Sequence, residues 1–282
     1  MVVESGLTAA SHERLQRVVA NARPDVNVVW ADAAQLDMTG LLGGRHISAS
    51  TYLRLFVDQL LPTEADRVLY LDADMLVRTD LTPLYQADLQ GKTIGAVRDL
   101  VIADLSHPYS GITDYMQRGL PSDGHYFNAG LLLIDLNRWR SERLGHAILE
   151  YARQHGGQGN FDQDALNASV HRDWTELDLT WNVQGSVLLL DEHPSHPWVE
   201  EMRALRADLL RDPATVHFSG TIKPWHASSG HPFACEWRRE LRRSSWYSAM
   251  EHARWAGPFG TKRLAVQVLV KSHRRAVREI SA

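Results

Sequence analysis

Short apolar runs alternate with helical patterns along most of the chain, and no other sequence feature limits the fold as strongly. Five runs rich in β-branched residues are expected to be strands: 26–30, 68–71, 93–97, 130–136 and 215–218. Helices are expected over 10–22, 50–61, 138–155 and 164–170. Continuous apolar strands are typical of a sheet that is covered by helices on both faces. The order therefore predicts an α/β protein in which ligands bind at the carboxyl ends of the strands.

Composition places the chain among ordinary globular proteins. It has 282 residues, 44% of them hydrophobic, with 34 acidic against 30 basic side chains and a net charge of −4. That balance argues against nucleic acid as a partner. No repeat, flexible linker, leader sequence or membrane-spanning apolar run is visible, so we expect a catalytic domain over 1–257. The single cysteine, Cys235, excludes an internal disulfide and fits a reducing compartment.

Two carboxylates follow the apolar run 68–71 directly, in the sequence RVLYLDAD. Since side chains alternate along a strand, Asp72 and Asp74 are expected to point to one side, while the small Ala73 leaves room for a ligand. Two like charges so close together need a cation, and carboxylate oxygens suit Mg²⁺ or Mn²⁺ bound to phosphates. The alternative is a solvated turn without a metal.

A second polar cluster, HFSGTIKPWH, begins inside the run 215–218. His217 could add an imidazole to the two carboxylates, and that donor set favours Mn²⁺ over Mg²⁺. Gly220 permits close approach of the backbone, and Lys223 is a compact positive charge that suits a diphosphate. The alternatives are a structural histidine and a solvated lysine.

Polar residues also lie around the run 130–136. In YFNAGLLLID, Asn128 offers an amide that both donates and accepts, next to the small Ala129 and Gly130. Later, FDQDALN places three polar side chains at a predicted helix start: Asp162, Gln163 and Asp164. Capping of that helix could by itself explain either aspartate, so this alternative stays open.

Five segments, in this order, resemble glycosyltransferase family 8, the retaining enzymes that include bacterial lipopolysaccharide galactosyltransferases and glucosyltransferases. They are RHISASTYLRL (45–55), RVLYLDADMLVRTDLTPLY (67–85), YFNAGLLLIDLNRWR (126–140), FDQDALN (161–167) and HFSGTIKPWH (217–226). The resemblance implies a GT-A fold, which is a Rossmann-like mixed sheet with helices on both faces.

The resemblance also implies a UDP-hexose donor, carrying glucose or galactose, whose diphosphate is bridged by Mn²⁺ or, as the second candidate, Mg²⁺. The acceptor would be a saccharide or a glycolipid such as lipopolysaccharide core. The positions that match the family's metal ligands are Asp72, Asp74 and His217. Those expected to contact the donor are Arg54, Asp99, Asn128, Ala129, Gly130, Asp162, Gly220 and Lys223.

Gln163 matches the amide that lies near the anomeric carbon in the family, on the face opposite the leaving group. Retention of configuration ordinarily suggests a carboxylate nucleophile, but an amide is a poor nucleophile. We therefore favour attack from the same face, in which the departing phosphate takes the acceptor proton and Gln163 supports the cation. A covalent intermediate on Asp162 or Asp164 is the alternative. The predicted catalytic residues are Gln163 and Asp162.

The family usually opens with a strand and a helix that hold uracil and ribose, whereas this chain begins at what resembles the second strand, VVESG. We expect a first strand to be missing from the middle of the sheet. One alternative function is therefore an inactive sugar-nucleotide-binding remnant. Another is a haloacid-dehalogenase-type phosphatase with Asp72 as nucleophile and Asp74 as acid/base, although the later acidic pair of such enzymes is missing.

The segment 258–282 combines apolar residues with basic ones. Within 261–282, six lysines and arginines stand against one glutamate. This pattern predicts a basic amphipathic segment that contacts anionic lipid. We expect a cytoplasmic protein that is held peripherally at the inner face of the membrane, near a lipid-linked acceptor.

Overall fold

The computed structural model describes residues 2–4, 8–41, 49–108, 112–155, 161–226, 228–244 and 246. The predicted C-terminal segment 258–282 lies outside the described residues. The chain forms two compact units: Met1–Trp30 together with Phe218–Ala282, and Ala31–His217. None of the described helices is long and apolar enough to span a lipid bilayer.

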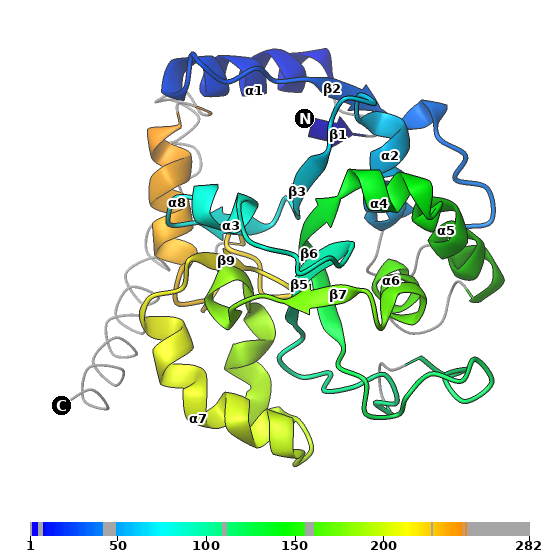
Figure 1. Cartoon of the computed structure of the whole chain (residues 1–282). Helices are drawn as coiled ribbons and strands as arrows, with labels where there is room; N and C mark the ends of the chain where they lie inside the picture. The colour runs from blue at the N-terminus through cyan, green and yellow to red at the C-terminus, as the bar shows by residue number, and fades with distance from the viewer. Residues whose placement is uncertain are drawn as a thin grey trace. The chain divides into compact units, whose positions relative to one another are not determined.

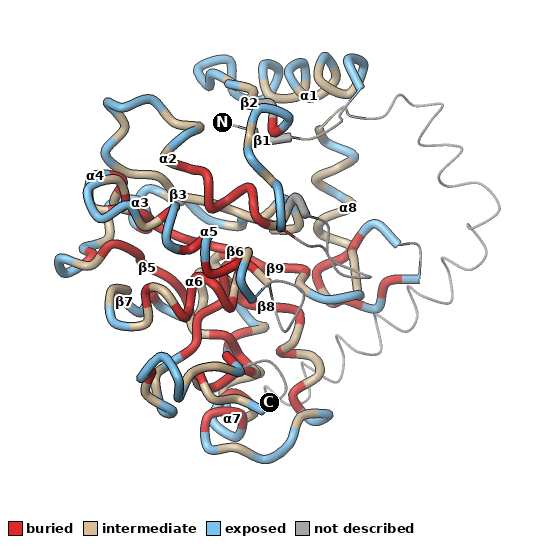
Figure 2. The backbone as a smooth tube through the Cα atoms, turned by 90° about the vertical axis from the view of Figure 1, so that its right-hand side faces the viewer, coloured by how far each residue is buried: buried red, intermediate tan, exposed pale blue. Residues whose placement is uncertain are grey.

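The larger unit, Ala31–His217, is built on a four-stranded mixed sheet (Figure 1). Its strands, in spatial order, are β3 (Arg67–Leu71), β6 (Phe127–Asp135), β5 (Ile94–Arg98) and β7 (Trp174–Glu176). Strand β6 is antiparallel to both β3 and β5, whereas β7 is parallel to β5. Figure 2 shows that β5 and β6 are buried over nearly their whole length. The predicted mixed sheet is confirmed.

Apolar side chains cover both faces of this sheet because they alternate along each strand. On one face, Tyr70, Ala96 and Leu132 join the main core beneath α4 (Leu136–Ser141), α5 (Leu144–His155) and α6 (Asp162–Val170). These three helices lie together in Figure 1. On the other face, Val97 and Leu131 pack with Leu84 of the short helix α3 (Thr82–Tyr85). The sheet is therefore enclosed, as the continuous apolar runs predict.

A second, three-stranded sheet in the same unit brings distant segments together. Strand β9 (Thr215–His217) lies between β4 (Met75–Val77) and β8 (Val183–Gln184), antiparallel to the first and parallel to the second. The register sets His217 opposite Met75. The adjoining elements η3 (Leu179–Asn182), η4 (Gly185–Glu192) and α7 (Pro197–Arg211) build a smaller core around Trp198 and Met202.

The smaller unit contains α1 (Ala9–Ala22) and α8 (Ala234–Arg243). Thr8 caps α1 by accepting a hydrogen bond from the backbone of Ser11. The His12 ring stacks on Trp30, with 4.1 Å between the ring centroids. Strands β1 (Val2–Glu4) and β2 (Trp30–Asp32) form a separate two-stranded sheet.

Three expected elements differ from the structure. Of the expected strand 26–30, only Trp30 belongs to β2. The expected helix 50–61 is mostly a 3₁₀ helix, η2 (Ala49–Phe56), which is followed by one α-helical turn, α2 (Val57–Leu60). Another 3₁₀ turn, η1 (Ala33–Gln35), lies earlier in the chain. The expected helix 138–155 is two helices, because Arg143 adopts φ 53°, a left-handed conformation that ends α4 before α5 begins.

Arg140 on α4 holds the segment that leads into β3. Its guanidinium donates to the carbonyl oxygens of Leu61, Pro62, Thr63 and Ala65 at 2.7–3.4 Å. Arg140→Met should lower the free energy of unfolding by about 1–3 kcal/mol, because each such bond contributes about 0.5–1.5 kcal/mol and water replaces some of them.

Urea unfolding followed by circular dichroism measures this loss. The control is Arg172→Met, which changes an exposed arginine and should stay within about 0.5 kcal/mol of the parent protein. If Arg140→Met cost no more than the control, the anchoring role of Arg140 would be wrong.

Candidate active site

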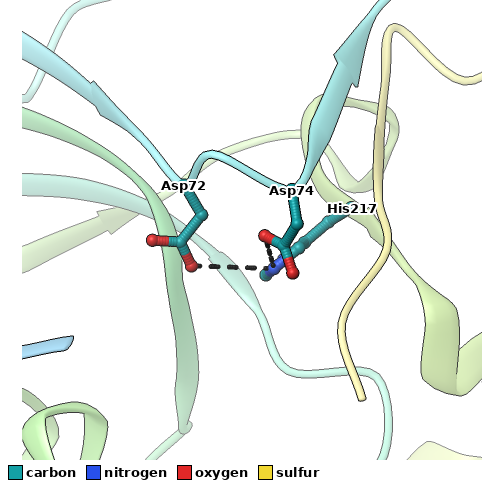
Figure 3. A group of neighbouring side chains, drawn as sticks. All are labelled: Asp72, Asp74 and His217. Atoms are coloured by element: carbon teal, nitrogen blue, oxygen red, sulfur yellow. Dashed lines mark ion pairs between the residues drawn. The ribbon is translucent and has the colours of Figure 1, made fainter. Parts of the chain in front are cut away.

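Asp72, Asp74 and His217 form a cluster in the larger unit (Figure 3). His217 Nε2 lies 3.3 Å from Asp74 Oδ1 and 3.6 Å from Asp72 Oδ2, and one ligand atom from each residue falls within 4.8 Å of the others. The pairing of β4 with β9 brings His217 to the aspartates, although it lies 143 positions after Asp74 in the chain. The structure thus brings the three predicted metal ligands together.

Asp72 and Asp74 do not alternate along one strand, so the expectation based on strand geometry is wrong. Strand β3 ends at Leu71, and residues 72–74 form a turn before β4 begins at Met75. The two carboxylates therefore converge through a turn between two strands of different sheets, and not through alternation along one strand.

Neighbouring side chains orient the Asp72 carboxylate. Tyr70 donates its hydroxyl to Asp72 Oδ1 at 2.6 Å, and Arg54 Nη2 lies 2.9 Å from the same oxygen. The other oxygen, Oδ2, is the one that faces His217. Because Oδ1 is occupied, Oδ2 is the oxygen of Asp72 that is directed into the cluster.

Arg54 is a buried cation between two carboxylates. Its Nε lies 2.9 Å from Asp162 Oδ2, its Nη1 donates to the Ala129 carbonyl, and its guanidinium carbon lies 4.8 Å from the centre of the Tyr70 ring. Burial disfavours this charge, but Asp162 and Asp72 outweigh it, so the pKa of Arg54 is raised above its ordinary value. Arg54 thereby connects the end of β3 to the start of α6.

Asp162 does not cap α6. The N-cap position belongs to Phe161, which makes no side-chain capping bond. Asp162 instead accepts a hydrogen bond from the Thr51 hydroxyl at 2.6 Å and pairs with Arg54. Burial raises the pKa of the Asp162 carboxyl, although Arg54 and Thr51 oppose the rise. The capping alternative is therefore wrong for Asp162.

Asp164 has a different partner, the buried hydroxyl of Tyr126. Burial, together with the nearby Asp164 carboxylate, raises the pKa of Tyr126 well above its ordinary value. Asp164 lies on the buried side of α6 and is not a member of the Asp72, Asp74 and His217 group.

Asp99, Asn128 and Gln163 form a second hydrogen-bonded group. Asn128 Nδ2 donates to Asp99 Oδ2 at 3.2 Å, and Gln163 Nε2 lies 3.5 Å from the same oxygen. Gln163 Oε1 accepts from the backbone N–H of Ala129 at 2.9 Å. That N–H needs a side-chain partner because the β5–β6 register jumps from Leu132 to Asn128, so residues 129–131 have no counterpart on β5.

Gly130 brings the two groups together. A Cβ atom at this position would lie 2.3 Å from Cε1 and 2.6 Å from Nδ1 of His217, which is closer than real atoms come. The backbone N–H of Gly130 donates to Asn128 Oδ1 at 3.1 Å, and its carbonyl accepts from the backbone N–H of Asp72 at 2.8 Å. A residue without a side chain is required here so that the His217 ring can lie against the strand.

Gly220 and Lys223 belong to the smaller unit. Gly220 has φ 77°, a left-handed conformation that favours glycine. Lys223 Nζ donates to the Phe218 carbonyl at 2.7 Å. These two predicted donor contacts therefore belong to a different unit from the cluster of Asp72, Asp74 and His217.

Sequence reasoning missed three residues that bond the predicted ones: Thr51, Tyr70 and Asn182. Tyr70 carried a usable signal, because it is a polar-tipped side chain only two positions before Asp72. Thr51 and Asn182 carried none, since their partners are 111 and 35 positions away in the chain.

Known proteins resemble this chain in sequence. The chain is 26% identical to General stress protein A of Bacillus subtilis (strain 168) over 250 residues, which are 87% of this chain and 82% of that protein. It is 25% identical to lipopolysaccharide 1,2-glucosyltransferase of Escherichia coli (strain K12) over 206 residues, 71% of this chain. The match spans only 56% of that second relative.

The fold is similar to the crystal structure of the galactosyltransferase LgtC in complex with donor and acceptor sugar analogs. The TM-score is 0.65 at 24% sequence identity, and the match covers 89% of this chain and 98% of the other. The predicted GT-A fold is confirmed. A family model, Glycosyl transferase family 8, matches residues 4–229, which is most of the sequence. The chain therefore belongs to glycosyltransferase family 8.

Proposed function

We propose that this glycosyltransferase is a metal-dependent retaining enzyme that moves glucose or galactose from a UDP-sugar to a saccharide or glycolipid such as lipopolysaccharide core. The observation that carries the proposal is the convergence of Asp72, Asp74 and His217 at one point. It is supported by two similar proteins, one named as a lipopolysaccharide glucosyltransferase and the other as a galactosyltransferase.

The donor set of the cluster fits a divalent cation. The cluster combines hard oxygen ligands, from two carboxylates, with one imidazole nitrogen. The carboxylate oxygens of Asp74 and Asp72 lie 3.3 and 3.6 Å from His217 Nε2. We expect Mn²⁺ rather than Mg²⁺, because Mg²⁺ prefers oxygen ligands throughout. When bound, such an ion supplies positive charge that stabilises the diphosphate as it leaves.

The remaining predicted residues would bind the donor. Asp99 and Asn128 offer a carboxylate and an amide, both buried as His217 is, and these groups suit the hydroxyl groups of a hexose. Arg54 would balance the carboxylates around the sugar, with Ala129, Gly130 and Asp162 beside it. We assign Gly220 and Lys223 to the diphosphate because a lysine ammonium is a compact counter-charge.

For the chemical step we propose Gln163 and Asp162 as the catalytic residues. The bond from the anomeric carbon to the phosphate oxygen breaks, and the acceptor oxygen bonds to that carbon on the same face. The acceptor proton moves to the departing phosphate oxygen. Two hydrogen bonds position the Gln163 amide, and the Asp162 carboxylate is paired with Arg54, which makes it a poorer nucleophile than a free carboxylate.

Turnover of the sugar nucleotide tests this proposal. The full chain is incubated with Mn²⁺ and either UDP-glucose or UDP-galactose, and release of UDP is measured. Release from one of them supports the enzyme. Binding of both without release would favour the alternative of an inactive sugar-nucleotide-binding remnant. The phosphatase alternative is wrong, because the chain belongs to glycosyltransferase family 8.

Asp74→Asn should reduce sugar transfer to below about a tenth of the parent rate, since loss of a ligand charge at the metal costs several kcal/mol of transition-state stabilisation. The melting temperature should hardly change, because the Asp74 side chain is partly exposed and lies in a turn. Asp208→Asn removes the same charge from an exposed ion pair on α7 and is the matched control. Activity of Asp74→Asn equal to that of the control would contradict the metal role.

Gly130→Ala should weaken Mn²⁺ binding by at least about tenfold, because the new methyl group displaces the His217 ring. Electron paramagnetic resonance of free Mn²⁺ measures the affinity. The control is Gly95→Ala, whose methyl group would meet the flexible end of Leu89 at 2.8 Å and not a cluster residue. The control should cost stability but leave the affinity unchanged. Equal affinities in both variants would argue against close packing of Gly130 on His217.

Deletion of residues 261–282 should release the protein from anionic vesicles and leave UDP-sugar hydrolysis nearly unchanged. The reason is the excess of basic over acidic side chains in this part of the sequence. Co-sedimentation with phosphatidylglycerol vesicles measures binding, and phosphatidylcholine vesicles are the control. Equal binding to both, or binding that salt does not weaken, would speak against the electrostatic attachment.

A further inference from the structure

A chain of buried amides links His217 to Asp99, and Asn182 is its central member. His217 Nδ1 lies 3.2 Å from Asn182 Oδ1. Asn182 Nδ2 donates to Asn128 Oδ1 at 3.0 Å, and Asn128 Nδ2 donates to Asp99 Oδ2 at 3.2 Å. All four residues are more than nine-tenths buried, so bulk water does not compete for these bonds.

Asp99 fixes which way the amides in this hydrogen-bonded series point. Asp99 Oδ1 already accepts from the backbone N–H groups of Val101 and Ile102, at 3.0 Å each. A carboxylate accepts hydrogen bonds, so the nitrogen of the Asn128 amide must face it. The Asn128 oxygen then points the other way, where it also accepts from the backbone N–H of Gly130 at 3.1 Å. A backbone N–H can only donate, so this second contact requires the same orientation of Asn128.

An amide has a donor on one side and an acceptor on the other, so the orientation of Asn128 fixes the orientation of Asn182. Because Asn182 gives its nitrogen to Asn128, its oxygen faces His217. An amide oxygen can only accept, so the contact with Asn182 is a hydrogen bond when the neutral imidazole carries its proton on Nδ1. The lone pair is then on Nε2, the nitrogen that faces Asp72 and Asp74.

We propose that Asn182 is a positioning residue that holds His217 in the Nδ1–H tautomer and so keeps the Nε2 lone pair directed at the metal position. The inference rests on the metal site proposed above. It also joins the ion to the sugar contacts, because Asn128 and Asp99, which we assign to the hexose, are in the same hydrogen-bonded chain. Movement of Asn128 on donor binding would thus shift His217, the proposed metal ligand, through Asn182.

The tautomer can be measured without metal or substrate. The full chain is labelled with ¹⁵N-histidine, and long-range ¹H–¹⁵N spectra are recorded at a pH where the ring is neutral. The His217 signals are those that His217→Gln removes. We expect the Nδ1–H tautomer in the parent protein. The Nε2–H tautomer in the parent protein would overturn the proposal without the need for any Asn182 variant.

Two substitutions of similar size separate the proposed role from simple packing. Asn182→Leu removes the acceptor and should give a mixture of His217 tautomers. Asn182→Asp keeps an oxygen in place and should retain the Nδ1–H tautomer, even though it also loses the bond to Asn128. An unchanged tautomer in Asn182→Leu would contradict the proposal.

Mn²⁺ affinity gives a second readout. Asn182→Leu should weaken binding by about 10- to 100-fold, as is usual when the partner of a ligating histidine is lost. Gln184→Met is the matched control: this buried amide is two positions away and, among the residues that the structure describes, its side chain bonds the backbone of Leu100 and Arg98. It should lose stability and keep the parent affinity.

These outcomes distinguish the two proposals. If the parent protein bound no Mn²⁺, the proposed metal dependence would be wrong, whereas the tautomer spectra would still decide the role of Asn182. If the parent protein bound Mn²⁺ and Asn182→Leu bound it equally well, the role of Asn182 would be wrong and the metal site would stand.

Discussion

The buried guanidinium of Arg54 is the interaction on which the candidate site depends. It pairs at 2.9 Å with Asp72, which follows β3, and at 2.9 Å with Asp162, the first residue of α6. Asp162 is buried and Asp72 is mostly buried, so without the cation their two charges would lie close together in a poorly solvated place. Charge balance therefore requires η2, β3 and α6 to meet, and this meeting orients the first of the proposed metal ligands.

A second constraint is the irregular pairing of β6 with β5. Where the register jumps, the backbone groups of Ala129 and Gly130 bond to side chains in place of a neighbouring strand. Gln163, Asn128 and Arg54 make these bonds, and all three are residues that we assign to donor binding or catalysis. Irregular pairing beside a site is common because it turns side chains and backbone toward a ligand. In this protein the same residues thus bond the unpaired backbone groups of the sheet and belong to the candidate site.

The match to glycosyltransferase family 8 includes the residues of the cluster. The family match covers 4–229, and the cluster lies where strands β3 and β9 end. The cluster and the Asp99 group are not independent, because Gly130 and Asn182 each contact both. A change in one group is therefore expected to displace residues of the other.

Local sequence patterns were enough to predict the α/β class, the strands β3, β5, β6 and β9, and the three residues of the cluster. These follow from local patterns: continuous apolar runs predict buried strands, and paired carboxylates or a histidine at a strand end stand out within a few residues. The same local patterns failed for 50–61 and 138–155, where a helical periodicity does not reveal a 3₁₀ helix or a left-handed break.

The hydrogen-bond partners of the polar side chains depend on tertiary contacts and could not be predicted from the sequence. From the sequence, Asp162 was equally well explained as a helix cap, and Thr51, Tyr70 and Asn182 had no assigned part. Their partners are supplied by segments that are distant in the chain and come together only when the sheets pair and the helices pack. A buried donor or acceptor must find a partner, but which partner it finds depends on the neighbours that folding places beside it, and no local pattern contains that information.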